Sequence, residues 1–88
     1  MASKKPVGYH ITEIQKGVCG ESSKILEEVH ELIDAEAQGC RIMALVELSD
    51  LIGAIELYLK KHYPGMCLSD LGIMSLITQR AFRSGARK

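Results

Sequence analysis

Hydrophobic residues recur at helical spacing along three stretches of this chain, with polar residues between them. The pattern predicts helices over about residues 21–38, 41–62 and 69–83, ended by glycine and proline signals at Gly39, at Tyr63-Pro64-Gly65 and at Ser84-Gly85. Ser69 and Asp70 offer N-cap chemistry for the third helix. No stretch shows the strict alternation of a strand, so the predicted fold class is all-α.

The segment from Tyr9 to Gly20 is harder to interpret. Thr12 and Gln15 have the spacing of a capping box, which favours a helix start. Gly17 and Gly20 oppose a continuous helix, because glycine is a poor helix former. We therefore expect a short helix or an extended piece that runs into the first long helix.

The middle predicted helix is apolar on almost every side between Ile42 and Leu59, and 47% of all residues are hydrophobic. We expect the 88 residues to form a single domain, with a flexible entry at residues 1–8 and a basic tail at 85–88. Three helices of one chain cannot surround such a helix completely. The surplus apolar surface predicts self-association, as a homodimer or homotetramer that completes a helical bundle.

Charge and cysteine content exclude several classes of function. Lys and Arg together number 11, equal to Asp and Glu together, so the chain lacks the excess of positive charge that is typical of a nucleic-acid-binding protein. No apolar stretch is long enough to span a membrane, and residues 1–8 lack a signal core. The three cysteines have no metal-ligand spacing and indicate free thiols. We expect a cytoplasmic protein that binds neither nucleic acid nor membrane.

Two acidic clusters carry the candidate chemistry. Glu27, Glu28 and Glu31 project from one side of the first long helix, and Glu47 and Asp50 lie one turn apart on the second. On a helical wheel Glu47 and Asp50 have apolar neighbours, so both are expected to point into packed surroundings. Carboxylates that converge from two helices repel one another unless a cation lies between them. A hard divalent ion such as Mg²⁺ fits, while a solvated acidic groove and accidental spacing are the alternatives.

The runs GESSKILEEVHELIDA and ELSDLIGAIELYL together resemble the MazG-type all-α nucleotide pyrophosphohydrolases, over roughly residues 20–83. That superfamily also includes dimeric dUTPases and phosphoribosyl-ATP pyrophosphohydrolases. The resemblance implies a helical bundle assembled as a dimer or tetramer. It also implies hydrolysis of a nucleoside triphosphate to the monophosphate and pyrophosphate, with Mg²⁺ or Mn²⁺ as cofactor and a role in nucleotide-pool control or housecleaning.

Matched motif to motif, the resemblance implies a metal site with four ligands: Glu28, Glu31, Glu47 and Asp50. Glu27 is then the catalytic candidate, left to activate water, to orient a ligand or to hold a second ion.

Three basic residues are candidate phosphate contacts. Lys24 precedes Glu28 by one turn and is either a simple i,i+4 ion pair or a phosphate contact beside the metal. Arg80 and Arg83 lie one turn apart on the last helix, where the helix dipole alone would favour them. The resemblance implies that such residues contact the triphosphate.

Two alternatives to this function stay open. One is a phosphoribosyl-ATP or dUTP pyrophosphohydrolase of the same superfamily, because spacing does not identify the residues that select the base. The other is a non-catalytic helical oligomerisation module whose acidic groove binds a basic partner. His10 and His62 flank predicted loops and show no metal-ligand spacing, and His30 is expected to be packed or on the surface.

Overall fold

The computed structural model describes residues 9–85, which contain three α-helices and no strands. Helix α1 spans Ser22–Ala37, α2 spans Arg41–His62 and α3 spans Leu68–Ser84. The all-α fold class is confirmed for this range, and the predicted helix ends lie within about one residue of the observed ones. The predicted flexible entry at 1–8 and the tail beyond Gly85 lie outside the described residues.

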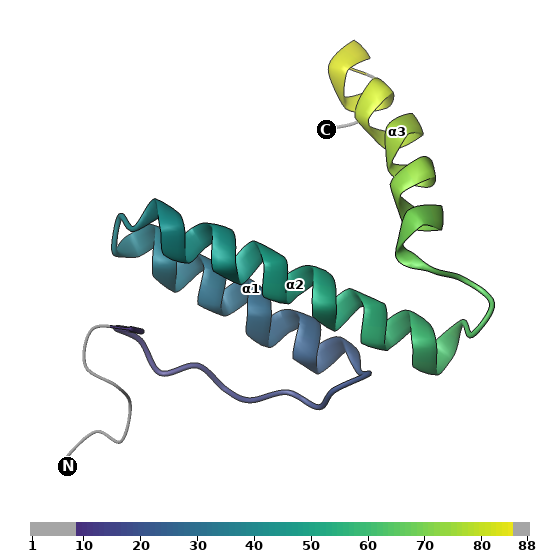
Figure 1. Ribbon diagram of the computed structural model, residues 1–88. Coiled ribbons are helices and arrows are strands. Elements are labelled where there is room, and N and C mark those ends of the chain that lie inside the picture. Colours follow the sequence, from purple (N-terminus) through teal and green to yellow (C-terminus); the bar gives the residue numbers. More distant parts are fainter. Residues whose placement is uncertain (1–8, 86–88) are drawn as a thin grey trace.

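Helices α1 and α2 pack side by side as an antiparallel hairpin (Figure 1). The chain reverses at Gln38–Cys40, where Gly39 has a positive φ of 70° that few other residues adopt. At the far end of the hairpin, Lys61 forms an ion pair with Glu21, and the His62 ring lies 3.1 Å from the Gly20 carbonyl oxygen. The two helices are therefore joined at one end by the turn and at the other by these side-chain contacts.

Residues 9–21 form an extended strap along α1 and contain no helix (Figure 1). The helix alternative for this segment is wrong, because Thr12 does not cap a helix of its own and donates its hydrogen bonds to Asp34. Gly17 allows the strap to approach the start of α1 closely. A Cβ at Gly17 would lie 2.2 Å from the Ser23 carbonyl oxygen, so no larger residue fits without a backbone shift.

Helix α3 extends away from the hairpin (Figure 1). It begins at Leu68, and Asp70 accepts the backbone N–H of Cys67 at 2.9 Å. Asp70 thus does stabilise the helix start, but from inside the first turn and not from the N-cap position. Within residues 9–85, α3 contacts α2 sparingly and does not contact α1.

Burial in this chain is inverted relative to an ordinary helical domain. In the described chain the buried charged residues are Glu27, Glu28, Asp34 and Glu47, and the buried apolar residues are Ala35, Ala54 and Leu59. Large apolar side chains are exposed on all three helices. They include Leu26, Ile33, Ile42, Leu45, Val46, Leu48, Ile52, Leu57, Ile73, Met74, Leu76, Ile77 and Phe82. The hairpin therefore encloses carboxylates and turns much of its apolar surface outward.

Across residues 9–85, none of the helices combines the length and the hydropathy needed to cross a bilayer.

We expect this apolar exterior to be covered by a second copy of the chain. Light scattering at micromolar concentration should give a mass of at least twice 9.7 kDa. Ile77→Asp should dissociate the assembly, because Ile77 is 71% exposed on α3 and a charge there would enter a desolvated interface.

Gln79→Asp is the matched control, since it places the same charge on an exposed polar position of α3. The wild-type chain eluting at 9.7 kDa would contradict self-association. If Ile77→Asp leaves the assembly as intact as Gln79→Asp does, the interface lies elsewhere.

Candidate metal centre

The hairpin brings the two acidic clusters together. Glu28 and Glu31 are three residues apart on α1, and Glu47 and Asp50 are three apart on α2, so each pair lies on one helix face. Antiparallel packing sets these faces against each other. One carboxylate oxygen from each residue can be chosen so that all four lie within 4.8 Å of one another. The predicted convergence of these four residues is confirmed.

The four carboxylates differ in burial. Glu47 is fully buried, Glu28 is buried and Glu31 is half-buried, whereas Asp50 is exposed. The expectation of packed surroundings is correct for Glu47 and wrong for Asp50, which stays exposed in the described chain, where α3 covers little of α2. The cluster is thus enclosed on the strap side and open at Asp50.

Two oxygens of the cluster lack hydrogen-bond partners. Glu28 Oε1 and Glu47 Oε1 are both buried, and no protein donor reaches either atom. Leaving a buried acceptor unsatisfied costs about 1–3 kcal/mol, and more when the group is charged. A cation bound among these oxygens would satisfy both atoms at once and offset the repulsion between carboxylates. The residues present therefore fit a divalent metal ion with oxygen ligands.

Crowding changes the proton affinity of the cluster. Burial, a hydrogen bond to Glu47 and repulsion from Glu28 and Glu47 raise the pKa of Glu31 to about 8. Burial and the charges of Glu47 and Glu28 also raise the pKa of Asp50. The metal-free cluster therefore holds a proton near neutral pH, which a bound metal ion would displace.

Lys24 lies beside the cluster, as its position one turn before Glu28 predicts. Its Nζ is 3.1 Å from Glu28 Oε2 and 3.2 Å from Glu27 Oε1. Burial alone would lower the pKa of Lys24, but the hydrogen bonds to Glu28 and Glu27 outweigh it and raise the pKa. The i,i+4 ion pair is present, and contact with a phosphate stays a prediction.

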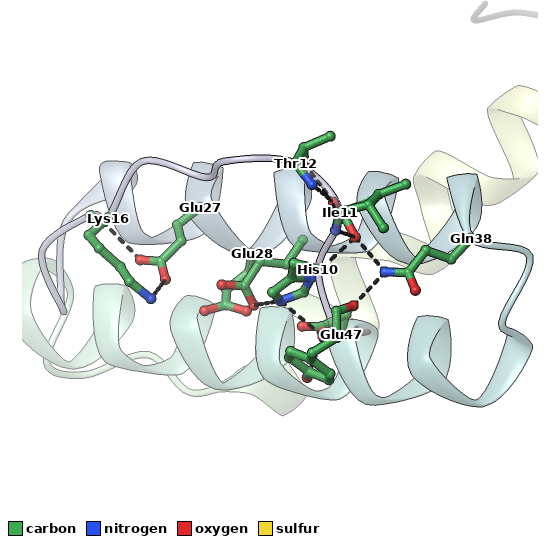
Figure 2. Close-up of polar contacts among 12 residues, drawn as sticks. His10, Ile11, Thr12, Lys16, Glu27, Glu28, Gln38 and Glu47 are labelled. Atoms are coloured by element: carbon green, nitrogen blue, oxygen red, sulfur yellow. Dashed lines mark hydrogen bonds and ion pairs between the residues drawn. The ribbon is translucent and has the colours of Figure 1, made fainter. Parts of the chain in front are cut away.

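Glu27 holds the strap. Its Oε1 accepts the Gly17 N–H at 2.9 Å, and its Oε2 lies 3.5 Å from Lys16 Nζ (Figure 2). Burial favours a higher pKa, but the Gly17 and Lys24 hydrogen bonds outweigh it and lower the pKa of Glu27. Glu27 is absent from the four-carboxylate set, and a lowered pKa makes it a weaker proton acceptor. Its catalytic role stays a prediction.

Asp34 is the second anchor of the strap. It accepts hydrogen bonds from the Ile11 and Thr12 amides, from the Thr12 hydroxyl at 2.5 Å and from the Gln38 amide group at 2.7 Å (Figure 2). Burial works against the charge, but these bonds outweigh it and hold the pKa of Asp34 well below its usual range. Asp34 follows Glu31 by three residues on the acidic face, yet its partners are unpredictable from the sequence because they come from a segment without regular structure.

The strap also brings two side chains to the cluster that the sequence did not indicate. The Tyr9 hydroxyl donates to Glu47 Oε2 at 2.7 Å, which with burial raises the pKa of Tyr9 to about 12. The His10 Nε2 atom lies 3.7 Å from Glu31 Oε1 and 3.9 Å from Glu47 Oε2. Neither residue shows ligand spacing, because each reaches the cluster through the fold of the strap and not through helical periodicity.

Arg80 and Arg83 do not join the cluster within one chain. Both are exposed on α3, which has no contact with α1 in the described residues. Two surface pockets, of about 420 and 400 Å³, lie near the two ends of α2 and include none of the four carboxylates. Their linings are the Glu36–Leu48 and the Gly53–Leu68 regions, so neither forms a base pocket beside the cluster.

Comparison of the chain with known protein families, with curated proteins and with solved structures finds no match. The class that the fold and the cluster define is an all-α protein with a candidate acidic metal centre.

The raised pKa of Glu31 predicts how stability depends on pH. Between its ordinary value of 4.5 and about 8, the folded protein binds more protons than the unfolded chain. The free energy of unfolding of the metal-free protein should therefore fall as pH rises through this window. Thermal melts in EDTA from pH 5 to pH 8 measure this effect, and Glu31→Gln should flatten the decline.

Glu56→Gln is the control, because Glu56 is exposed on α2 outside the cluster. An unchanged slope in Glu31→Gln would contradict the assignment of the proton to this site.

Proposed function

We propose that this chain is a Mg²⁺-dependent nucleoside triphosphate pyrophosphohydrolase of the MazG-like kind. The observation that carries the proposal is the convergence of Glu28, Glu31, Glu47 and Asp50 with two buried, unpartnered oxygens. A structural acidic groove would leave those oxygens in water or pair them with donors. Their burial without a donor supports a cation site over the groove that binds a basic partner.

The proposed ligands are these four carboxylates, with Mg²⁺ as the expected ion and Mn²⁺ as its substitute. When bound, the ion would polarise the phosphates and lower the pKa of a coordinated water. The exposure of Asp50 leaves an open side through which a triphosphate could approach. The products would be the nucleoside monophosphate and pyrophosphate.

The chain's own residues would then neutralise and orient the substrate. Lys24 already lies at the edge of the cluster and could transfer from Glu28 to a phosphate oxygen without moving its backbone. Glu27 stays the proposed proton acceptor. Its hydrogen bonds to Gly17 and Lys24 keep it ionised, but they also lower its pKa and so make it a weaker base. Glu27→Gln would retain an acceptor for the Gly17 amide and remove the charge. It therefore separates the role of Glu27 as an anchor of the strap from its proposed role as a proton acceptor.

A panel of ribo- and deoxyribonucleoside triphosphates, assayed for pyrophosphate release with Mg²⁺, tests the activity and identifies the base. dUTP and phosphoribosyl-ATP belong in the panel as the alternatives within the superfamily. Asp50→Asn should abolish turnover while the helices persist, because it removes an exposed ligand charge and keeps the side-chain shape.

Glu56→Gln serves as the control and should behave as the wild type. Pyrophosphate release by Asp50→Asn at the wild-type rate would overturn the ligand assignment. Absence of both turnover and Mg²⁺-dependent thermal stabilisation would favour the non-catalytic module.

Arg80 and Arg83 would have to reach the substrate from another copy of the chain, since α3 does not contact α1. Arg80→Ala and Arg83→Ala should each reduce turnover at least about tenfold, equivalent to roughly 1.4 kcal/mol. Arg→Lys should recover only part of the loss, because the ammonium lacks the planar fork. Arg41→Ala is the control, nine residues and about 14 Å along α2 from Asp50.

Mixing two inactive variants tests whether the site is shared. If Arg80 of one copy serves the carboxylates of the other, refolding Asp50→Asn together with Arg80→Ala should restore up to about a quarter of wild-type activity in dimers. No recovery on mixing, with both single variants inactive, would place Arg80 in the site of its own chain.

A further inference from the structure

His10 bridges two groups of carboxylates. Its Nδ1 lies 3.3 Å from Oδ1 of Asp34, which is buried and already tied to the backbone of the strap. Its Nε2 faces the other way, 3.7 Å from Glu31 Oε1 and 3.9 Å from Glu47 Oε2. The ring is held between an anchor and two members of the acidic cluster, and its side chain is only 12% exposed.

The two sets of distances suggest different roles for the two ring nitrogens. At 3.3 Å, Nδ1–H can donate to Asp34, and this tautomer leaves a lone pair on Nε2. The separations of 3.7 and 3.9 Å on the other side are too long for hydrogen bonds. Ligand atoms that each lie roughly 2.1 Å from one metal ion are about 3.0–3.4 Å apart in octahedral or tetrahedral geometry, so the two oxygens would need to approach Nε2 by only about half an ångström to share an ion with it.

We propose that His10 Nε2, Glu31 and Glu47 form a second metal position, with a nitrogen ligand, on the strap side of the acidic cluster. This inference rests on the metal centre proposed above and adds a ligand of different chemistry to it. A second observation supports a cation at this carboxylate: the fully buried Glu47 approaches His10 through Oε2, and its Oε1 has no hydrogen-bond partner. Asp34 acts as the positioning residue, in the carboxylate–histidine–metal arrangement that orients many metal-bound imidazoles.

The ligand sets define two neighbouring positions. Glu31 and Glu47 belong to both sets, while His10 belongs to one and Glu28 and Asp50 belong to the other. Glu31 and Glu47 each have two oxygens and can therefore bridge two ions, as carboxylates do in two-metal hydrolytic sites. The hydrogen bond from Tyr9 to Glu47 Oε2 does not prevent this, because a carboxylate oxygen has two lone pairs.

The nitrogen ligand predicts a metal preference. Imidazole suits Zn²⁺, Fe²⁺ and Ni²⁺, whereas Mg²⁺ prefers oxygen ligands and retains its waters. The strap-side position should therefore take a transition-metal ion, while the position between Glu28 and Asp50 accepts Mg²⁺. Loss of His10 should weaken transition-metal binding and leave Mg²⁺ binding nearly unchanged.

Mn²⁺ alone is the probe, because its pulsed electron paramagnetic resonance spectrum detects a directly bound ¹⁴N nucleus. The full-length wild-type protein should bind two Mn²⁺ per chain and show ¹⁴N modulation. His10→Gln should lose the modulation, bind one Mn²⁺ per chain and lose at least about tenfold in affinity for the other ion. His30→Gln is the matched control, since His30 is exposed on α1 outside both ligand sets and should retain both ions.

Each other outcome has a definite meaning. Mn²⁺ binding without ¹⁴N modulation in the wild type, or modulation that persists in His10→Gln, overturns His10 as a ligand and leaves the four-carboxylate site intact. No Mn²⁺ binding to the wild type overturns the metal centre itself. Circular dichroism of His10→Gln and an unchanged Mg²⁺ affinity confirm that the variant is folded, so a lost signal reports the ligand alone.

Discussion

The burial of uncompensated carboxylate oxygens is the constraint on which the rest of this structure depends. Glu28 and Glu47 face each other across the α1–α2 contact, and each retains one oxygen without a donor. A helical hairpin that only had to be stable would bury leucines at this contact. The chain instead tolerates a cluster in which burial and neighbouring carboxylates raise the pKa of Glu31, and these carboxylates could hold a cation.

The strap is the device that makes this burial possible. Its two anchors are acidic side chains of α1, Glu27 at the Gly17 amide and Asp34 at the Ile11 and Thr12 amides. Backbone amides of the strap satisfy both carboxylates, and Lys16 of the strap adds an ion pair to Glu27. The strap thereby covers one side of the cluster, excludes water from Glu47 and delivers Tyr9 and His10 to it.

The same arrangement explains why the outside of the hairpin is apolar. Because the α1–α2 contact and the strap enclose acidic residues, side chains such as Leu26 and Ile33 on α1 remain exposed, and α3 covers little of α2. A second copy that covers these faces would supply the hydrophobic burial that one chain lacks. The proposed assembly and the proposed activity would then be coupled, since Arg80 and Arg83 are on the helix that leaves its own hairpin.

The sequence by itself determined the helices and the four converging carboxylates. Both depend on local periodicity, so the spacing of Glu28 with Glu31 and of Glu47 with Asp50 placed each pair on one helix face. Only the tertiary structure decided what covers each face. It left Asp50 exposed, tied Glu27 to the strap, gave Asp34 its partners and brought His10 to the cluster from more than twenty residues away in sequence. Such contacts depend on the path of a segment without regular structure, and no periodicity encodes that path.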